Sequence, residues 1–106
     1  EPAGFRWLEA NDADANVIAF LRLTADGERA FACVCNFAPV PRYDYRVGFP
    51  VAGYWRERKN SDAALYGGST LGNAGAVVAE PVPHHGQPAS AALVLPRLAA
   101  LVFDRG

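Results

Sequence analysis

Short apolar runs rich in β-branched and aromatic residues, separated by proline and glycine, account for most of this 106-residue chain. Runs of this length, bounded by Gly/Pro clusters, are typical of β-strands rather than helices. The runs that we expect to form strands are 17–24, 30–37, 43–47, 53–59, 76–79, 89–95 and 98–103. Six or seven short strands at this spacing predict an all-β fold, an antiparallel β-sandwich with Greek-key-like connections.

Turn residues predict how these runs connect. Asp26 and Gly27 supply the positive φ of a tight hairpin between the first two runs. Gly48 and Pro50 are expected to end the third run, because proline removes a donor from the strand ladder. The last two runs are expected to form a closing pair around Pro96.

Alternation within the runs predicts which side chains face the core. In 53–59 it places Trp55 inward and Arg56 and Arg58 outward. Residues 60–75 hold four glycines and show little periodicity, so we expect a long ordered loop there.

The two cysteines, Cys33 and Cys35, lie two positions apart in one predicted strand. They point to the same face, about 6.5 to 7 Å apart along it, so a disulfide between them is strained. Two thiols are too few for a structural zinc site, and no Cys/His partner pair stands at metal spacing. We expect both cysteines to act as small buried hydrophobic residues, in a protein that works in a reducing, cytoplasmic compartment.

Charge and length exclude several classes of partner. A formal net charge of −1 with both signs mixed does not favour nucleic acid or an anionic membrane surface. No apolar run reaches the roughly 18 residues of a membrane span, and the first residues do not form a signal peptide. The chain has no methionine, so we expect it to be a piece of a larger protein.

Three patterns resemble functional motifs but lack residues that those motifs require. Residues 12–16 open like a calcium loop, but Val17 stands where that loop needs glycine. The glycines of 67–72 lack the Lys-Ser/Thr that ends a phosphate loop. No Gly-x-Ser-x-Gly elbow accompanies the histidines at 84–85. We therefore predict no catalytic residue, metal site or cofactor site in this chain.

Tryptophan and tyrosine are abundant for a chain of this size. Their flat rings stack on the apolar faces of sugar rings, and they equally fill cores with the polar tip bonded to backbone. The residues that could make such contacts are Trp7, Tyr43, Tyr45, Tyr54, Trp55 and Tyr66.

The segments that carry a family resemblance are 4–8, 36–48, 53–57, 60–62, 66–69, 72–75, 85–86 and 93–96. Residues 36–46, NFAPVPRYDYR, are the most specific of them. In this order the segments resemble the C-terminal region of bacterial glycogen branching enzymes, members of the α-amylase superfamily, over essentially all 106 residues.

The resemblance implies that residues 1–106 form a single all-β domain that follows a catalytic (β/α)₈ barrel. Such enzymes cut an α-1,4 glucan chain and rejoin it through an α-1,6 bond, using two carboxylates of the barrel. The fragment alone is then catalytically silent, and its partner is the barrel of the same parent chain. Either it only docks on and stabilises the barrel, or it also contacts glucan. In the second case the resemblance makes Trp7 the preferred contact, because it lies in the first matched segment, where the chain has just left the barrel, and Tyr66 and Trp55 come next. A free-standing carbohydrate-binding module is the alternative.

Overall fold

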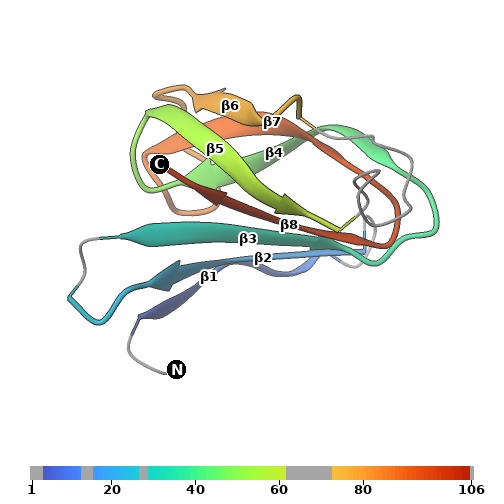
Figure 1. Cartoon of the computed structure of the whole chain (residues 1–106), viewed down its shortest axis with the longest axis horizontal. Helices are drawn as coiled ribbons and strands as arrows, with labels where there is room; N and C mark the ends of the chain where they lie inside the picture. Colours follow the sequence, from blue (N-terminus) through green and yellow to red (C-terminus); the bar gives the residue numbers. More distant parts are fainter. Residues whose placement is uncertain (1–3, 13–15, 27–28, 62–72, 106) are drawn as a thin grey trace.

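The computed structural model describes residues 4–12, 16–26, 29–61 and 73–105 (Figure 1). The strands in these residues are β1 (Phe5–Asp12), β2 (Val17–Leu23), β3 (Ala30–Asn36), β4 (Arg42–Phe49), β5 (Gly53–Asn60), β6 (Ala76–Ala79), β7 (Ala89–Leu95) and β8 (Ala99–Asp104). All their pairings are antiparallel. Within the described ranges the chain forms no helix, and so none long and apolar enough to span a membrane.

The strands form two sheets, one with the order β1-β2-β3-β8-β5-β6 and one with the pair β4-β7. The chain passes from one sheet to the other after β3, β4, β6 and β7, which gives the Greek-key-like connections that were predicted. The prediction of an antiparallel β-sandwich is confirmed.

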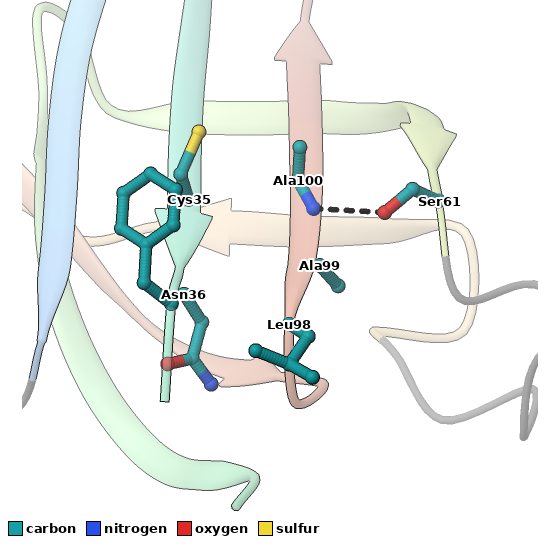
Figure 2. A pocket seen from close by; sticks show the side chains of 7 residues that line it. Cys35, Asn36, Ser61, Leu98, Ala99 and Ala100 are labelled. Atoms are coloured by element: carbon teal, nitrogen blue, oxygen red, sulfur yellow. Dashed lines mark hydrogen bonds between the residues drawn. The ribbon is translucent and has the colours of Figure 1, made fainter. Parts of the chain in front are cut away.

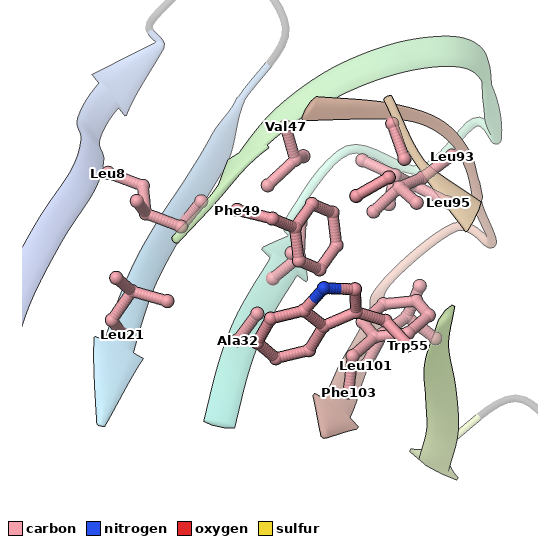
Figure 3. Packing of buried hydrophobic residues seen from close by; sticks show 14 of the residues in the cluster. Leu8, Leu21, Ala32, Val47, Phe49, Trp55, Leu93, Leu95, Leu101 and Phe103 are labelled. Atoms are coloured by element: carbon pink, nitrogen blue, oxygen red, sulfur yellow. The ribbon is translucent and has the colours of Figure 1, made fainter. Parts of the chain in front are cut away.

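The hydrophobic core lies between the two sheets. Phe49 of β4 contacts Trp55 of β5 and Phe103 of β8, with ring centroids 4.9 and 6.0 Å apart. Figure 3 shows these rings pointing toward one another from opposite sheets. Around them lie buried aliphatic side chains from both sheets, among them Leu21, Val34, Val47, Leu93, Leu95 and Leu101. Alternation along each strand brings these residues to one side, as the sequence predicted for Trp55.

All seven predicted strands are present, and β1 is an eighth that sequence patterning missed. Its pairing with β2 shifts register between Trp7 and Glu9 and again between Glu9 and Asp12. Such irregularities break the strict alternation by which a strand is recognised in sequence. The described residues include only the two ends of the predicted 60–75 loop and of the calcium-loop-like segment 12–16. The glycine-rich segment 67–72 lies wholly outside them.

One predicted strand boundary and one predicted strand pairing need correction. β4 continues through Gly48 to Phe49, so this glycine lies inside the strand. β7 and β8 do not pair with each other: β7 pairs with β4, and β8 lies between β3 and β5. The amide of Leu98 donates to the carbonyl of Ala38 at 3.1 Å, which ties the turn after β7 to the end of β3 and directs β8 onto that strand.

The two faces of β3 are covered to different degrees. Ala32, Val34 and Asn36 are buried toward the core. Cys33 and Cys35 are free thiols on the opposite side and are half-buried, so the prediction that they are buried is wrong. The side of the six-stranded sheet that carries them, away from β4 and β7, is called the outer face below.

Candidate functional site

The outer face carries an apolar surface that this chain covers only partly. One row crosses five strands in register and consists of Trp7, Phe20, Cys33, Val102 and Lys59. A second row pairs Ile18 with Cys35 and Cys35 with Ala100. The small side chains of β3 and β8 at the centre are Cys33, Cys35, Ala100 and Val102, and this set is called the trough.

An aromatic cluster borders the trough on the side of β1 and β2. Phe5 stacks on Phe20 with ring centroids 5.0 Å apart, and the Trp7 ring meets both edge-on at 5.1 and 6.0 Å. The Trp7 side chain is 47% exposed, although aromatic rings of this size are usually far more buried. The cluster, Phe5, Trp7 and Phe20, is called the aromatic ridge.

Basic side chains gather at one end of the trough. Asp104, whose side chain is 3% exposed, accepts hydrogen bonds from Nη2 of Arg29 and Nε of Arg58, each at 2.6 Å. Arg56 faces Asp104 in register. The set called the basic end comprises Arg22, Arg29, Arg56, Arg58 and Lys59, the single lysine of the chain. Arg22 lies opposite Phe31 and Lys59 opposite Val102 in the register, so basic side chains outnumber the one carboxylate at this end of the outer face.

A pocket of about 220 Å³ opens at the opposite end of the trough. Figure 2 shows Cys35 of β3 and Ala100 and Leu98 around it. Its walls are almost entirely apolar, and Phe37 and Leu98 beside it are more than half exposed. The nearby Ser61 hydroxyl is already used, because it accepts a hydrogen bond from the Ala100 amide at 2.9 Å. The pocket therefore suits an apolar side chain.

The two thiols in the trough are not activated as nucleophiles. Burial raises the pKa of Cys33 and Cys35 above the ordinary thiol value. Neighbouring Cys35 raises the pKa of Cys33 further, and Arg22 acts in the opposite direction. Both thiols are therefore protonated at neutral pH, and the reactive form, the thiolate, is scarce.

Polar residues of the most specific motifs turn out to organise the fold. The Asn36 side-chain amide donates to the carbonyls of Val40 and Pro96, each at 3.1 Å, and its oxygen accepts from the Ala38 amide at 2.9 Å. Asn73 likewise binds both backbone groups of Val94, at 3.0 and 2.7 Å. Because these hydrogen bonds use both the oxygen and the amide group of each side chain, neither asparagine has a free group for a ligand. Each joins segments far apart in sequence, and this structural role cannot be recognised from the local sequence pattern.

The histidines also serve the fold. His85 Nδ1 accepts a hydrogen bond from the Gly48 amide at 3.2 Å, and its ring lies against that of His84. The Ser90 hydroxyl donates to the Val82 carbonyl at 2.6 Å and accepts from Arg46 at 2.7 Å. Ser90 is thus held away from any nucleophilic role.

Of the three predicted sugar contacts, only Trp7 lies at the described surface. Trp55 is fully buried, and its indole N–H donates to the Val51 carbonyl at 3.0 Å. Its ring has no face left for a sugar, which corrects the prediction for Trp55: it is a core residue. Tyr66 lies outside the described residues. Sugar contact by Trp7 stays a prediction.

Metal ligands do not assemble in the parts of the chain that the structure describes: no group of three or more His, Cys, Asp or Glu side chains is placed to hold an ion. The carboxylate of Asp104 is neutralised by arginine, and Glu57 accepts a hydrogen bond from Asn73 at 2.8 Å. Among the described residues, the outer face is the candidate functional site.

Comparison with known proteins agrees with the all-β architecture. The 1,4-alpha-glucan branching enzyme GlgB of Cupriavidus pinatubonensis is 55% identical over 104 residues, which cover 97% of this chain and 14% of that enzyme. The proteins of the same name from Burkholderia vietnamiensis and Aquifex aeolicus are 56% and 49% identical, over 95% and 94% of this chain and 14% and 16% of their own lengths. The chain thus spans only about one seventh of the relatives it matches.

The family comparison covers almost the whole sandwich. Residues 7–106, from the aromatic ridge to beyond β8, match the model described as the alpha amylase C-terminal all-beta domain. With the antiparallel strands of both sheets inside that match, the chain belongs to the alpha-amylase C-terminal all-beta domain family.

Proposed function

We propose that this chain is the C-terminal β domain of a 1,4-α-glucan branching enzyme and that it supports the catalytic barrel of its parent chain without taking part in bond breaking. The observation that carries the proposal is the identity of 49–56% to branching enzymes over 94–97% of the chain. Two free thiols further support a cytoplasmic, reducing environment.

The chemistry of the parent is the transfer of an α-1,4 glucan segment to an α-1,6 position. A retaining transfer needs one carboxylate as nucleophile and a second as acid and base, facing a common sugar site. In the described residues Asp104 is buried under two arginines and Glu57 is bound to Asn73. This supports assigning the catalytic pair to the barrel.

The outer face supports a docking role. The aromatic ridge and the trough together form a continuous apolar surface that the domain itself leaves half-exposed. Large apolar patches of this kind on a soluble domain mark interaction surfaces. In the proposed parent, the barrel covers this face and removes its apolar side chains from water.

Docking on this face is tested in the intact branching enzyme by Phe20→Lys, with Tyr43→Lys on β4 as the matched control. We expect Phe20→Lys to lower the melting temperature and the branching rate, because it places a charge in an apolar contact. Tyr43 is 62% exposed on the other sheet, so its replacement leaves both values unchanged. Branching is followed by the loss of iodine colour of amylose.

The thiols give a second readout of the same contact. Alkylation of Cys33 and Cys35, at a pH high enough to form thiolate, is expected to be slower in the intact enzyme than in the isolated chain. Equal alkylation rates, together with no effect of Phe20→Lys, would contradict docking on the outer face. An intact parent that does not branch amylose would contradict the assignment itself.

Glucan contact by Trp7 is the second candidate function, supported by its exposed ring. Since Trp55 is buried, Trp7 is the tryptophan whose fluorescence reports on a surface ligand. We expect maltoheptaose to leave the fluorescence of the isolated chain unchanged, because the recorded ring neighbours of Trp7 are apolar phenylalanines rather than partners for hydroxyls. A saturable change that Trp7→Ala abolishes would instead identify a carbohydrate-binding surface.

A further inference from the structure

The trough is long and wide enough to hold one α-helix. Together with the rings that flank it at its two ends, Phe31 and Phe37, the trough extends roughly 20 Å at the rise of a strand. It is two strands wide, and the taller side chains of β2 and β5 border it about 14 Å apart, three strand spacings. An α-helix with its side chains is about 10–12 Å across, and about 13 residues of helix span 20 Å.

Its floor is made of small groups. Cys33, Cys35, Ala100 and Val102 stand between Phe20 on one side and Lys59 on the other. Small residues allow a helix to approach the sheet closely, whereas a sugar chain needs hydrogen-bond partners that this floor lacks. The same floor has no free strand edge, because β3 and β8 are paired on both sides, so an added strand cannot extend the sheet there.

The two ends of the trough differ in chemistry, which fixes the polarity of its occupant. At the basic end, Arg29 and Arg58 are engaged with Asp104, while Arg22, Arg56 and Lys59 remain on the exposed surface. At the other end is the apolar pocket beside Phe37 and Leu98. Complementary groups are carboxylates at one end and a bulky apolar side chain at the other.

We propose that the trough seats one amphipathic α-helix of the parent's catalytic barrel, with its acidic residues on the basic end and an apolar side chain in the pocket. The inference rests on the proposed function, because the outer ring of a (β/α)₈ barrel consists of helices. It goes further by stating the secondary structure and charge pattern of the segment that docks.

Lys59 allows a direct test, because it is the only lysine of the domain. A carbodiimide joins its amine to a carboxylate in contact, without a spacer, and mass spectrometry of the intact enzyme identifies the linked residue. We expect a link from Lys59 to an aspartate or glutamate of the barrel. Lys59→Arg keeps the charge and removes the amine, so this link is lost while the melting temperature is unchanged.

Arg56→Lys adds a second amine on β5. The sequence spacing between the carboxylates linked to positions 56 and 59 then shows whether the docked segment is a helix or a strand. Because β5 shifts register between Glu57 and Lys59, positions 56 and 59 lie opposite Asp104 and Val102, only two residues apart on β8. This is roughly 7 Å along the sheet, which corresponds to about four or five residues of helix but about two of strand. Linked carboxylates about four or five residues apart on one segment are therefore the expected result.

Three outcomes would overturn the helix inference: linked carboxylates at strand spacing, no link to the barrel, or a link between two copies of the chain. If Phe20→Lys still disrupts the enzyme in any of these cases, the domain docks on its outer face but not through an acidic helix. The inference and the proposed function can thus fail separately.

Discussion

Replacing Trp55 by alanine is expected to lower the free energy of unfolding by about 3–5 kcal/mol. The ring is fully buried, packs against Phe49 and donates its N–H to the Val51 carbonyl. Its removal leaves a cavity between the two sheets and a carbonyl without its donor. Because domains of this size have a total stability of about 5–15 kcal/mol, the variant is close to unfolding at room temperature.

Urea denaturation followed by far-UV circular dichroism measures this loss. Tyr54→Ala is the matched control: the neighbouring side chain is 54% exposed, so its loss stays within about 0.5 kcal/mol. Trp55→Phe retains most of the apolar volume and falls between the two. A loss for Trp55→Ala no larger than that of Tyr54→Ala would show that the indole does not fill the core.

Replacing Gly48 by alanine is expected to cost about 3 kcal/mol or more, at the upper end for overpacking. A methyl group on Gly48 meets the His84 carbonyl oxygen at 2.2 Å, and this neighbour is backbone that no rotamer change can move aside. The displaced segment carries a tight turn at His85 and Gly86, both at positive φ, closed by two hydrogen bonds between His84 and Gln87. The bond from the Gly48 amide to His85 is then lost as well.

Gly86→Ala separates this clash from backbone strain. Gly86 has a φ of 72°, but a methyl group there meets no atom within 4 Å, so the cost is about 1–2 kcal/mol from the left-handed conformation alone. The same denaturation measurement compares the two variants. If Gly48→Ala is the milder of the two, the close approach of β4 to the His84 backbone is absent in solution.

Sequence patterning predicts the elements of this fold better than their partners. The turn chemistry predicted at Gly27 stays a prediction, because that residue lies outside the described residues. The inward direction of Trp55 and the antiparallel pairing of β2 with β3 follow from alternation and from two apolar runs close together in sequence. The pairing of β8 does not, because it depends on contacts of the turn at 96–98 with the end of β3, about 60 positions away. Gly48 illustrates the same limit: locally it indicates a strand end, while its role is to admit a distant backbone.

The candidate site was predictable only in part. Trp7 is marked by its residue type, and the segment that contains it resembles a family motif. The basic end is not visible in sequence, because Arg58 and Asp104 meet only after β5 and β8 have paired, and Arg22 reaches the same face from β2. The trough is missed for a related reason: cysteine and alanine are typical of buried positions, so the pattern predicts a core where the fold leaves a half-covered face.

The central position of β8 has a consequence for synthesis on the ribosome. Translation delivers β8 after every strand it joins, yet β8 lies between β3 and β5 and is clamped there through Asp104. Until it emerges, two strand edges in the middle of the future sheet have no partner, and unpaired edges are where nascent chains associate wrongly. The domain therefore closes in one late step, and a message truncated before β8 yields two separate half-sheets rather than a slightly shorter sandwich.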